Sequence, residues 1–359
     1  MNGFCERDLP SRPFCRFLRR VPPKEIMLQC AVEEAHTMKT VLVGTYTTGT
    51  ESEGIYRLRE DDQGRFGEIE LALRSHDASY LLPVKGGLYF VDEALGEKEG
   101  RVSYARKTEA GYEVVTTLPT GGENPCHLAL SPSGNTLAVA NYTSGSVALF
   151  AARGEGLERL ALIPGEHGSV NASRQEGPHA HFVAFEGEDT LYVSDLGADE
   201  IRTIRRIEGT WRAFAPAHVF APGAGPRHFV RRGKVWYVIC EMGNVLYRLS
   251  PGGETVLPVT DAGVPGTSAA VRLGEDGGIY CTQRGADVLT VFRDDAEGLR
   301  REGIWPAGGR TPRDCLPMGN RILCACQDSA EVTVLERIQQ DIRLRQRIAV
   351  PGAVCLAEE

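Results

Sequence analysis

The 359-residue sequence contains no apolar run that approaches the ~20 residues needed to cross a bilayer. Its first residues also lack the apolar segment of a secretory signal peptide. Lysine and arginine are scattered and the net charge is −8, which argues against nucleic acid or an anionic membrane surface as the main partner. The ten cysteines follow no spacing of a secreted disulfide framework. These absences predict a protein of a reducing, cytoplasmic compartment.

Long helical periodicities are also scarce, whereas turn-forming residues are abundant, with 41 glycines and 20 prolines. Short apolar strands that resemble the segment Leu191–Asp195 recur every 43 to 54 residues. They begin at Val41, Leu88, Leu137, Leu191, Trp236, Ile279 and Ile322. Further short strands surround each copy, and four strands in about 40–50 residues are typical of a β-propeller blade. The sequence therefore predicts an all-β, seven-bladed β-propeller with four antiparallel strands per blade.

The two ends of the chain differ from this repeat. Residues 1–37 mix arginine and proline without strand alternation, and we expect a disordered leader or a start placed too early, with room for a short helix around 25–34. Residues 38–359 form the single propeller domain. The last segment, Gly352–Ala357, has no second strand after it, so we expect it to become the innermost strand of blade 1 and to close the ring.

Polar residues gather where the repeat brings strand ends together. The start of one antiparallel strand and the end of the next lie at the same edge. The starts of the first strands carry His179, His181, Arg227, His228 and Arg313. The ends of the second strands carry Tyr46, Asp195, Glu241 and Arg284. So many charged groups at one mouth of the channel predict a site for a small anionic ligand.

Simpler roles exist for the same residues. The arginines can pair with carboxylates to tie blades together, His181 and His228 can pack against neighbours, and Asp195 can cap a loop. His179 and His181 also have a spacing that zinc sites use, but the surrounding arginines would repel a cation. No Gly-x-Ser-x-Gly motif is present, and Ser268 has no evident base. We therefore expect neither a metal nor a nucleophilic serine.

A series of short motifs resembles the seven-bladed lactonase propeller family, which includes bacterial 6-phosphogluconolactonases and fungal carboxy-cis,cis-muconate cyclases. The resemblance covers residues 39–356 and depends on the order of the motifs at blade spacing. They are Val43–Tyr46, Asn124–Leu128, Ser131–Gly134, Gly177–His181, Asp195–Asp199, Gly225–His228, Arg284-Gly285 and Thr311–Arg313. Two positions depart from the family pattern: Ala270 stands where an acidic residue is usual, and Gln283 stands in place of asparagine.

The resemblance implies a metal-independent and cofactor-free lactone hydrolase with a small anionic lactone as its substrate. The family's proposed catalytic residues carry over to His179, Arg227, Glu241 and Arg284. The implied reaction opens 6-phosphogluconolactone to 6-phosphogluconate, a step of the pentose phosphate pathway. His179 or Glu241 is then the base, and Arg227 and Arg284 hold the oxyanion or a carboxylate.

The substrate is expected to touch further groups at the same mouth. Arg313 and His228 are expected to reach its phosphate, and His181, Tyr46 and Asp195 are expected to contact it as well. A lactonising cyclase and a non-catalytic binding or interaction scaffold are the alternative functions. The expected state is a monomer or a weak homodimer.

Overall fold

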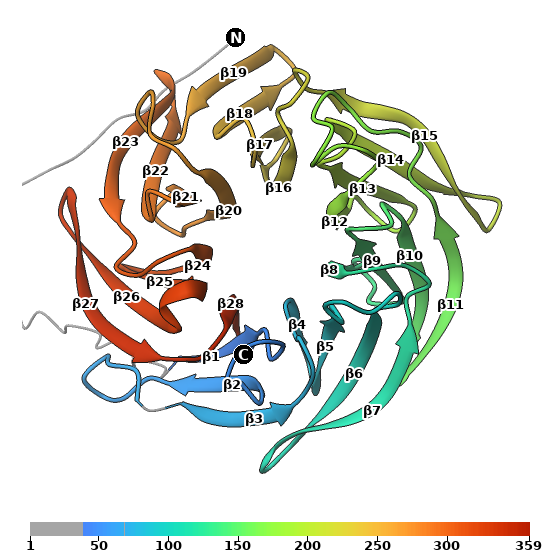
Figure 1. The fold of residues 1–359 in the computed structure, drawn as a ribbon, viewed down its shortest axis with the longest axis horizontal. Coiled ribbons are helices and arrows are strands. Elements are labelled where there is room, and N and C mark those ends of the chain that lie inside the picture. Colours follow the sequence, from blue (N-terminus) through green and yellow to red (C-terminus); the bar gives the residue numbers. More distant parts are fainter. Residues whose placement is uncertain (1–38, 68) are drawn as a thin grey trace, which may run out of the picture. The chain divides into compact units, whose positions relative to one another are not determined.

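The computed structural model describes residues 39–67 and 69–359. They form seven antiparallel sheets of four strands each. Figure 1 shows these sheets as blades around a central axis, with the first strand of each blade nearest the axis. The seven-bladed propeller predicted from the sequence is thus confirmed. The predictions for the leader, including the helix at 25–34, lie outside the described residues.

The blades follow one another in chain order, and their strands run from the axis outward. Blade 1 contains β28 (Ala353–Glu358), β1 (Thr40–Thr45), β2 (Gly54–Arg59) and β3 (Glu70–Arg74). Blade 2 contains β4 (Leu81–Val84), β5 (Gly87–Asp92), β6 (Arg101–Thr108) and β7 (Gly111–Pro119). Blade 3 contains β8 (Pro125–Leu130), β9 (Thr136–Asn141), β10 (Val147–Arg153) and β11 (Gly156–Ile163). Blade 4 contains β12 (Ala180–Phe185), β13 (Thr190–Asp195), β14 (Glu200–Ile207) and β15 (Thr210–Val219).

The remaining three blades have the same order. Blade 5 contains β16 (Pro226–Arg232), β17 (Val235–Cys240), β18 (Val245–Ser250) and β19 (Gly253–Pro258). Blade 6 contains β20 (Thr267–Leu273), β21 (Ile279–Arg284), β22 (Val288–Asp295) and β23 (Gly298–Pro306). Blade 7 contains β24 (Pro312–Met318), β25 (Arg321–Cys326), β26 (Glu331–Ile338) and β27 (Asp341–Ala349), and a 3₁₀ turn, η1 (Gln327–Ser329), follows β25. Within the described residues, no helix is long and apolar enough to cross a membrane.

The second strand of each blade begins within one residue of the predicted position, as β9 and β13 illustrate. These strands are apolar because their two faces pack against the two neighbouring blades. All six residues of β9 are buried, and its side chains enter two different hydrophobic clusters. Such double burial gives nearly continuous apolar runs, which made this strand the clearest signal in the sequence.

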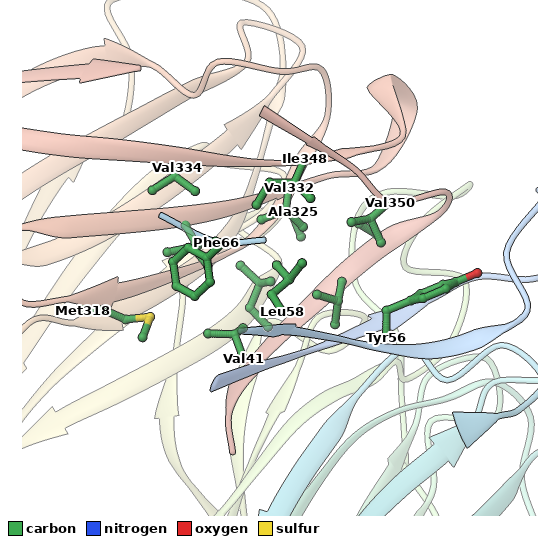
Figure 2. Close-up of a cluster of buried hydrophobic side chains, with 14 residues drawn as sticks. Val41, Tyr56, Leu58, Phe66, Met318, Ala325, Val332, Val334, Ile348 and Val350 are labelled. Carbon is green, nitrogen blue, oxygen red and sulfur yellow. The ribbon is translucent and has the colours of Figure 1, made fainter. Parts of the chain in front are cut away.

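The ring closes through β28, which pairs antiparallel with β1 as predicted. Its register aligns Val41 with Glu358 and Val43 with Leu356. Leu356 joins a cluster of 14 buried apolar residues drawn from blades 7 and 1. Figure 2 shows part of this cluster, in which Val41 and Leu58 of blade 1 meet Val332 and Ile348 of blade 7. The C-terminal strand therefore joins the last blade to the first.

The register shifts between the first and second strands in six blades, and in five of them the shift is a β-bulge near the start of the first strand. The pairing of this strand with the second strand skips one residue, which is left without a partner in the ladder. The skipped residues are Val354, Cys126, His181, Arg227 and Arg313. All five line one cavity inside the channel. In these five blades, the bulge thus directs one side chain into the cavity.

Candidate active site

Three arginines converge on the carboxylate of Glu241, the residue that follows β17. Nη2 of Arg174 lies 2.7 Å from Oε1. Nε of Arg227 and Nη2 of Arg284 lie 3.0 and 2.8 Å from Oε2. The carboxylate is 4% exposed, so this charge cluster is almost fully desolvated. Three positive charges on one negative charge leave the mouth of the channel with a positive excess, which favours an anionic ligand.

The protonation state of Glu241 follows from these neighbours. Burial alone would raise the pKa of its carboxyl group, but the charges of Arg284 and Arg227 and the hydrogen bond from Arg174 outweigh burial and lower the pKa to about 2. A carboxylate that is this weak a base, and whose two oxygens are both paired, is a poor acceptor for a proton from water at neutral pH. Glu241 instead holds the arginines in place.

His179 lies beside this cluster, directly before β12. Its Nδ1 is 3.0 Å from the backbone oxygen of Tyr142, and its ring stacks on the Tyr142 ring at 4.6 Å between centroids. Nδ1 therefore donates its proton to that carbonyl, and Nε2 carries the free lone pair. Nε2 is buried and makes no hydrogen bond within the described residues, while Oε1 of Glu176 lies 3.3 Å away. This carboxylate is placed to pair with the imidazole once Nε2 is protonated.

Two arginine nitrogens at the site also lack an aligned acceptor. The Nε atoms of Arg227 and Arg284 are buried, and neither makes a hydrogen bond within the described part of the chain. Buried polar atoms without partners are rare in folded proteins and call for an explanation at each position. Together with Nε2 of His179, they give two donors and one acceptor at the mouth with unused hydrogen-bonding capacity. A bound substrate and a water molecule would use it.

Four of the predicted site residues line one small cavity in the channel, and Arg227 belongs both to this cavity and to the Glu241 cluster. His181, His228 and Arg313, with Arg227, line a cavity of about 20 Å³, which is room for one water molecule. The pKa values of His181 and His228 lie well below the ordinary value because burial and then the charge of Arg227 disfavour the imidazolium. Both rings are therefore neutral, and Nε2 of His228 accepts a hydrogen bond from Arg227 at 3.1 Å.

Tyr46 and Arg313 form a second polar group, which meets this cavity at Arg313. The Tyr46 hydroxyl donates to Oε2 of Glu93 at 2.9 Å and accepts from Nη2 of Arg313 at 2.8 Å. The Arg313 guanidinium also lies over the Tyr46 ring, 5.3 Å from its centroid. The structure thus gives Arg313 a partner of its own and does not bring it onto Glu241.

Asp195 has the contacts of a loop cap. Its fully buried carboxylate accepts hydrogen bonds from the backbone N–H groups of His179 and Ala198 at 2.7 and 3.1 Å. Arg202 lies 3.3 Å from the other oxygen. Asp195 therefore fixes the backbone of His179, and none of its contacts within the described residues is to the arginine cluster.

Two residues at the site were missed in the sequence, and a third was given no role. Arg174 and Glu176 lie in the connection 164–179 between β11 and β12, whereas Tyr142 follows β9 at a strand end that the repeat places at the mouth. Strand alternation carries no information about such a connection, so the repeat does not predict Arg174 or Glu176. The one available signal was length, because the 54-residue spacing from Leu137 to Leu191 is the longest in the repeat.

A metal site does not form from these side chains. No group of three or more His, Cys, Asp or Glu residues in the described chain is arranged to hold a metal ion. His179 lies at the mouth against Tyr142, whereas His181 lies at the deeper cavity beside the Cys126 thiol. The seven described cysteines are free and buried. The hydroxyl of Ser268 donates to Asn244 at 2.7 Å and is buried, which gives it a structural contact.

Replacing Glu241 with glutamine should destabilise the protein. The change leaves three guanidinium groups without their counter-charge, and uncovering a buried ion in this way typically costs about 3 kcal/mol or more. Because the pKa of Glu241 is lowered from 4.5 to about 2, its contribution is present above pH 4.5 and is lost as the pH falls towards 2. Thermal unfolding of both proteins from pH 7 to pH 2 should show a gap that closes on acidification. Equal melting temperatures at pH 7 would contradict this account.

Comparisons with known proteins agree with this architecture. A family model described as "Lactonase, 7-bladed beta-propeller" matches residues 40–357. The 6-phosphogluconolactonase of Bacillus subtilis is 28% identical over 345 residues, which cover 88% of this chain and 96% of the relative. That of Formosa agariphila is 27% identical over 350 residues, with 88% and 98% covered. The solved structure of the periplasmic gluconolactonase of Pseudomonas aeruginosa is 27% identical and superposes with a TM-score of 0.82, covering 90% of this chain and 99% of its own.

Proposed function

The chain belongs to the seven-bladed β-propeller lactonase family, and from this premise we propose that it hydrolyses 6-phosphogluconolactone to 6-phosphogluconate, as in the pentose phosphate pathway. The observation that carries the proposal is that Nε2 of His179, which makes no hydrogen bond within the described residues and lies 3.3 Å from Glu176, is at the same mouth as a positively charged cluster. Hydrolysis of a lactone needs a base for water and donors for the oxyanion. Both are present here.

The proposed reaction begins with proton transfer from water to Nε2 of His179. The oxygen of that water attacks the lactone carbonyl carbon, and the carbonyl oxygen takes up negative charge. The guanidinium groups of Arg284 and Arg227 stabilise this oxyanion, and their fixed orientation on Glu241 means that little reorganisation is needed. The bond from the carbonyl carbon to the ring oxygen then breaks, and His179 returns its proton to that oxygen. Glu176 stabilises the imidazolium between the two transfers.

Measuring hydrolysis of 6-phosphogluconolactone above its uncatalysed rate in water tests this proposal. The lactone opens by itself in water, so the measured quantity is the rate above that of a protein-free sample, followed as acid release or as 6-phosphogluconate formed. We expect saturable turnover that is proportional to enzyme concentration. A rate that equals the background at every enzyme concentration would leave the propeller as a binding scaffold and would refute the proposed activity.

We also propose that the reaction needs no metal ion. The support is the charge of the site, because three arginines at the mouth disfavour a cation, and the tasks of base and oxyanion stabiliser are filled by side chains. Dialysis against EDTA should leave the rate of lactone hydrolysis unchanged. A loss of activity that returns when a divalent cation is added would contradict metal independence. The proposed lactonase activity would still stand.

We further propose that the enzyme is cytoplasmic and that it acts on a small anionic lactone as a monomer or weak homodimer. We expect neither nucleic acid nor a membrane as a partner. The free, buried thiols of the described residues are compatible with a reducing compartment. Light scattering over a range of protein concentrations, with the full chain, tests the oligomeric state. A stable higher oligomer at low concentration would overturn that part of the proposal.

A further inference from the structure

The relatives are named for lactones that differ in one respect, the presence of a phosphate group. Two are named for a phosphorylated lactone and one for gluconolactone without phosphate. We propose that Arg174 binds the phosphate of the substrate and makes this enzyme select phosphorylated over unphosphorylated lactones. The inference rests on the proposed lactonase function and adds to it the residue that determines specificity.

Arg174 is held in place by an anchored connection. In segment 164–179, the buried amide of Gln175 donates to the backbone oxygen of Leu196 at 2.9 Å, and the hydroxyl of Ser169 donates to Asp199 at 2.6 Å. The backbone N–H of Ser169 also donates to the oxygen of Gln175 at 2.9 Å. The residue next to Arg174 is thus fixed to blade 4, so the guanidinium has a defined position without being part of a strand.

The guanidinium of Arg174 is anchored through one nitrogen only. Nη2 donates to Oε1 of Glu241 at 2.7 Å and to the hydroxyl of Tyr142 at 3.2 Å. Nε and Nη1 have no partner within residues 39–67 and 69–359. The side chain is 40% exposed, compared with 17% for Arg284 and 3% for Arg227. Arg174 therefore keeps two donor groups for a ligand, the N–H of Nε and the NH₂ of Nη1, which point to different sides of the guanidinium and each can donate to a phosphate oxygen.

Tyr142 lies between the Arg174 guanidinium and the proposed catalytic base, His179. His179 stacks on the face of the Tyr142 ring, and Arg174 bonds to the hydroxyl at the end of the same ring. The length of a phenol is comparable to that of a six-membered lactone. A substrate whose carbonyl lies at Nε2 of His179 could therefore place its C6 substituent near Arg174.

Charge favours a phosphate at this place. The single negative charge of Glu241 is already shared with Arg227 and Arg284, so Arg174 adds positive charge that the cluster does not neutralise. Glu176, two residues further along, is directed to Nε2 of His179 at 3.3 Å. A phosphate dianion supplies the missing charge, whereas the hydroxyl of gluconolactone does not.

Arg313 already has a partner of its own. Its Nη2 donates to the Tyr46 hydroxyl at 2.8 Å, and with His228 it lines the cavity of about 20 Å³, which has room for one water molecule. This placement moves the phosphate contact from the residues expected from the sequence to a residue of the connection 164–179.

Comparing two substrates on one variant tests the proposal. Arg174→Gln keeps a donor for Glu241 and removes the charged fork. We expect kcat/KM for 6-phosphogluconolactone to fall roughly 10- to 100-fold, mainly through KM, which matches the loss of one charge-assisted contact. The value for gluconolactone should change little. Arg310→Gln is the matched control, because Arg310 is an exposed arginine before β24 whose Nη2 bonds only to the backbone oxygen of Asp328. It should leave both substrates unaffected.

Binding of the two products provides a readout that does not need turnover. Calorimetry should show tighter binding of 6-phosphogluconate than of gluconate to the wild-type protein, and the difference should vanish in Arg174→Gln. Equal losses on both lactones would mean that Arg174 acts only by positioning Glu241, and unchanged affinities for both products would also overturn the proposal. If the wild type hydrolyses neither lactone, the proposed function fails, and the product affinities still decide whether Arg174 recognises phosphate.

Discussion

Removing residues 352–359 should abolish cooperative folding of the propeller. The deletion takes away β28, exposes the ladder edge of β1 and uncovers the cluster between blades 7 and 1. Val354 and Leu356 are buried, and each such side chain contributes about 2 kcal/mol, so their loss together with the strand pairing is comparable to the whole stability of a typical domain, about 5–15 kcal/mol. We expect aggregated protein or a broad, non-cooperative unfolding transition.

Removing Glu359 alone is the matched control for this deletion. Glu359 forms an ion pair with Arg57 at 2.9 Å, and its other oxygen accepts from the Tyr112 hydroxyl at 2.7 Å. These contacts are lost in the control while β28 stays complete, so we expect a lower melting temperature with a transition that remains sharp. If the protein without residues 352–359 melts like the wild type, the closure through β28 does not stabilise the ring in solution.

Replacing His179 with asparagine should remove most of the lactonase activity. The asparagine amide can still donate to the Tyr142 backbone oxygen, but nothing replaces the lone pair of Nε2. General base catalysis typically contributes 10²- to 10⁴-fold, and we expect a loss of lactone turnover of that order. The melting temperature should change little, because the donor to the Tyr142 carbonyl is kept. Initial rates above background and thermal unfolding measure the two quantities.

His167→Asn is the control, since His167 lies in the same connection with 56% of its side chain exposed. It should keep full activity. A His179→Asn protein that retains activity within a few-fold of the wild type would show that another group activates the water. A loss of activity accompanied by early melting would instead assign His179 to structure.

Much of the fold could be predicted from the sequence because the buried second strand of each blade is a run of apolar residues that recurs at blade spacing. β9 is buried on both faces and begins at Thr136, next to the predicted start at Leu137. The closing strand could be inferred because a propeller without it would end on an open edge. The bulges could not be predicted in detail, since a skipped residue such as His181 changes which side chains face the axis without changing the apolar pattern.

The site was predictable only where it lies on strand ends. His179, Arg227, Glu241 and Arg284 were singled out by their place in the repeat, and the structure brings the last three into contact. Arg174 was missed because the connection 164–179 has no periodic pattern and because its partner, Glu241, lies 67 residues away in the sequence. The choice of base was left open because the sequence does not reveal that three arginines share one carboxylate. That grouping lowers the pKa of Glu241, and this is why we propose His179 as the base.

The most direct test of the central claim is a crystal structure of the protein with 6-phosphogluconate bound. We expect the product at the mouth of the channel, with its carboxylate near His179 and Arg284 and its phosphate in contact with Nε or Nη1 of Arg174. Product found instead in the outer groove of about 260 Å³ near Trp236 and His218, with the mouth empty at saturating concentration, would contradict it.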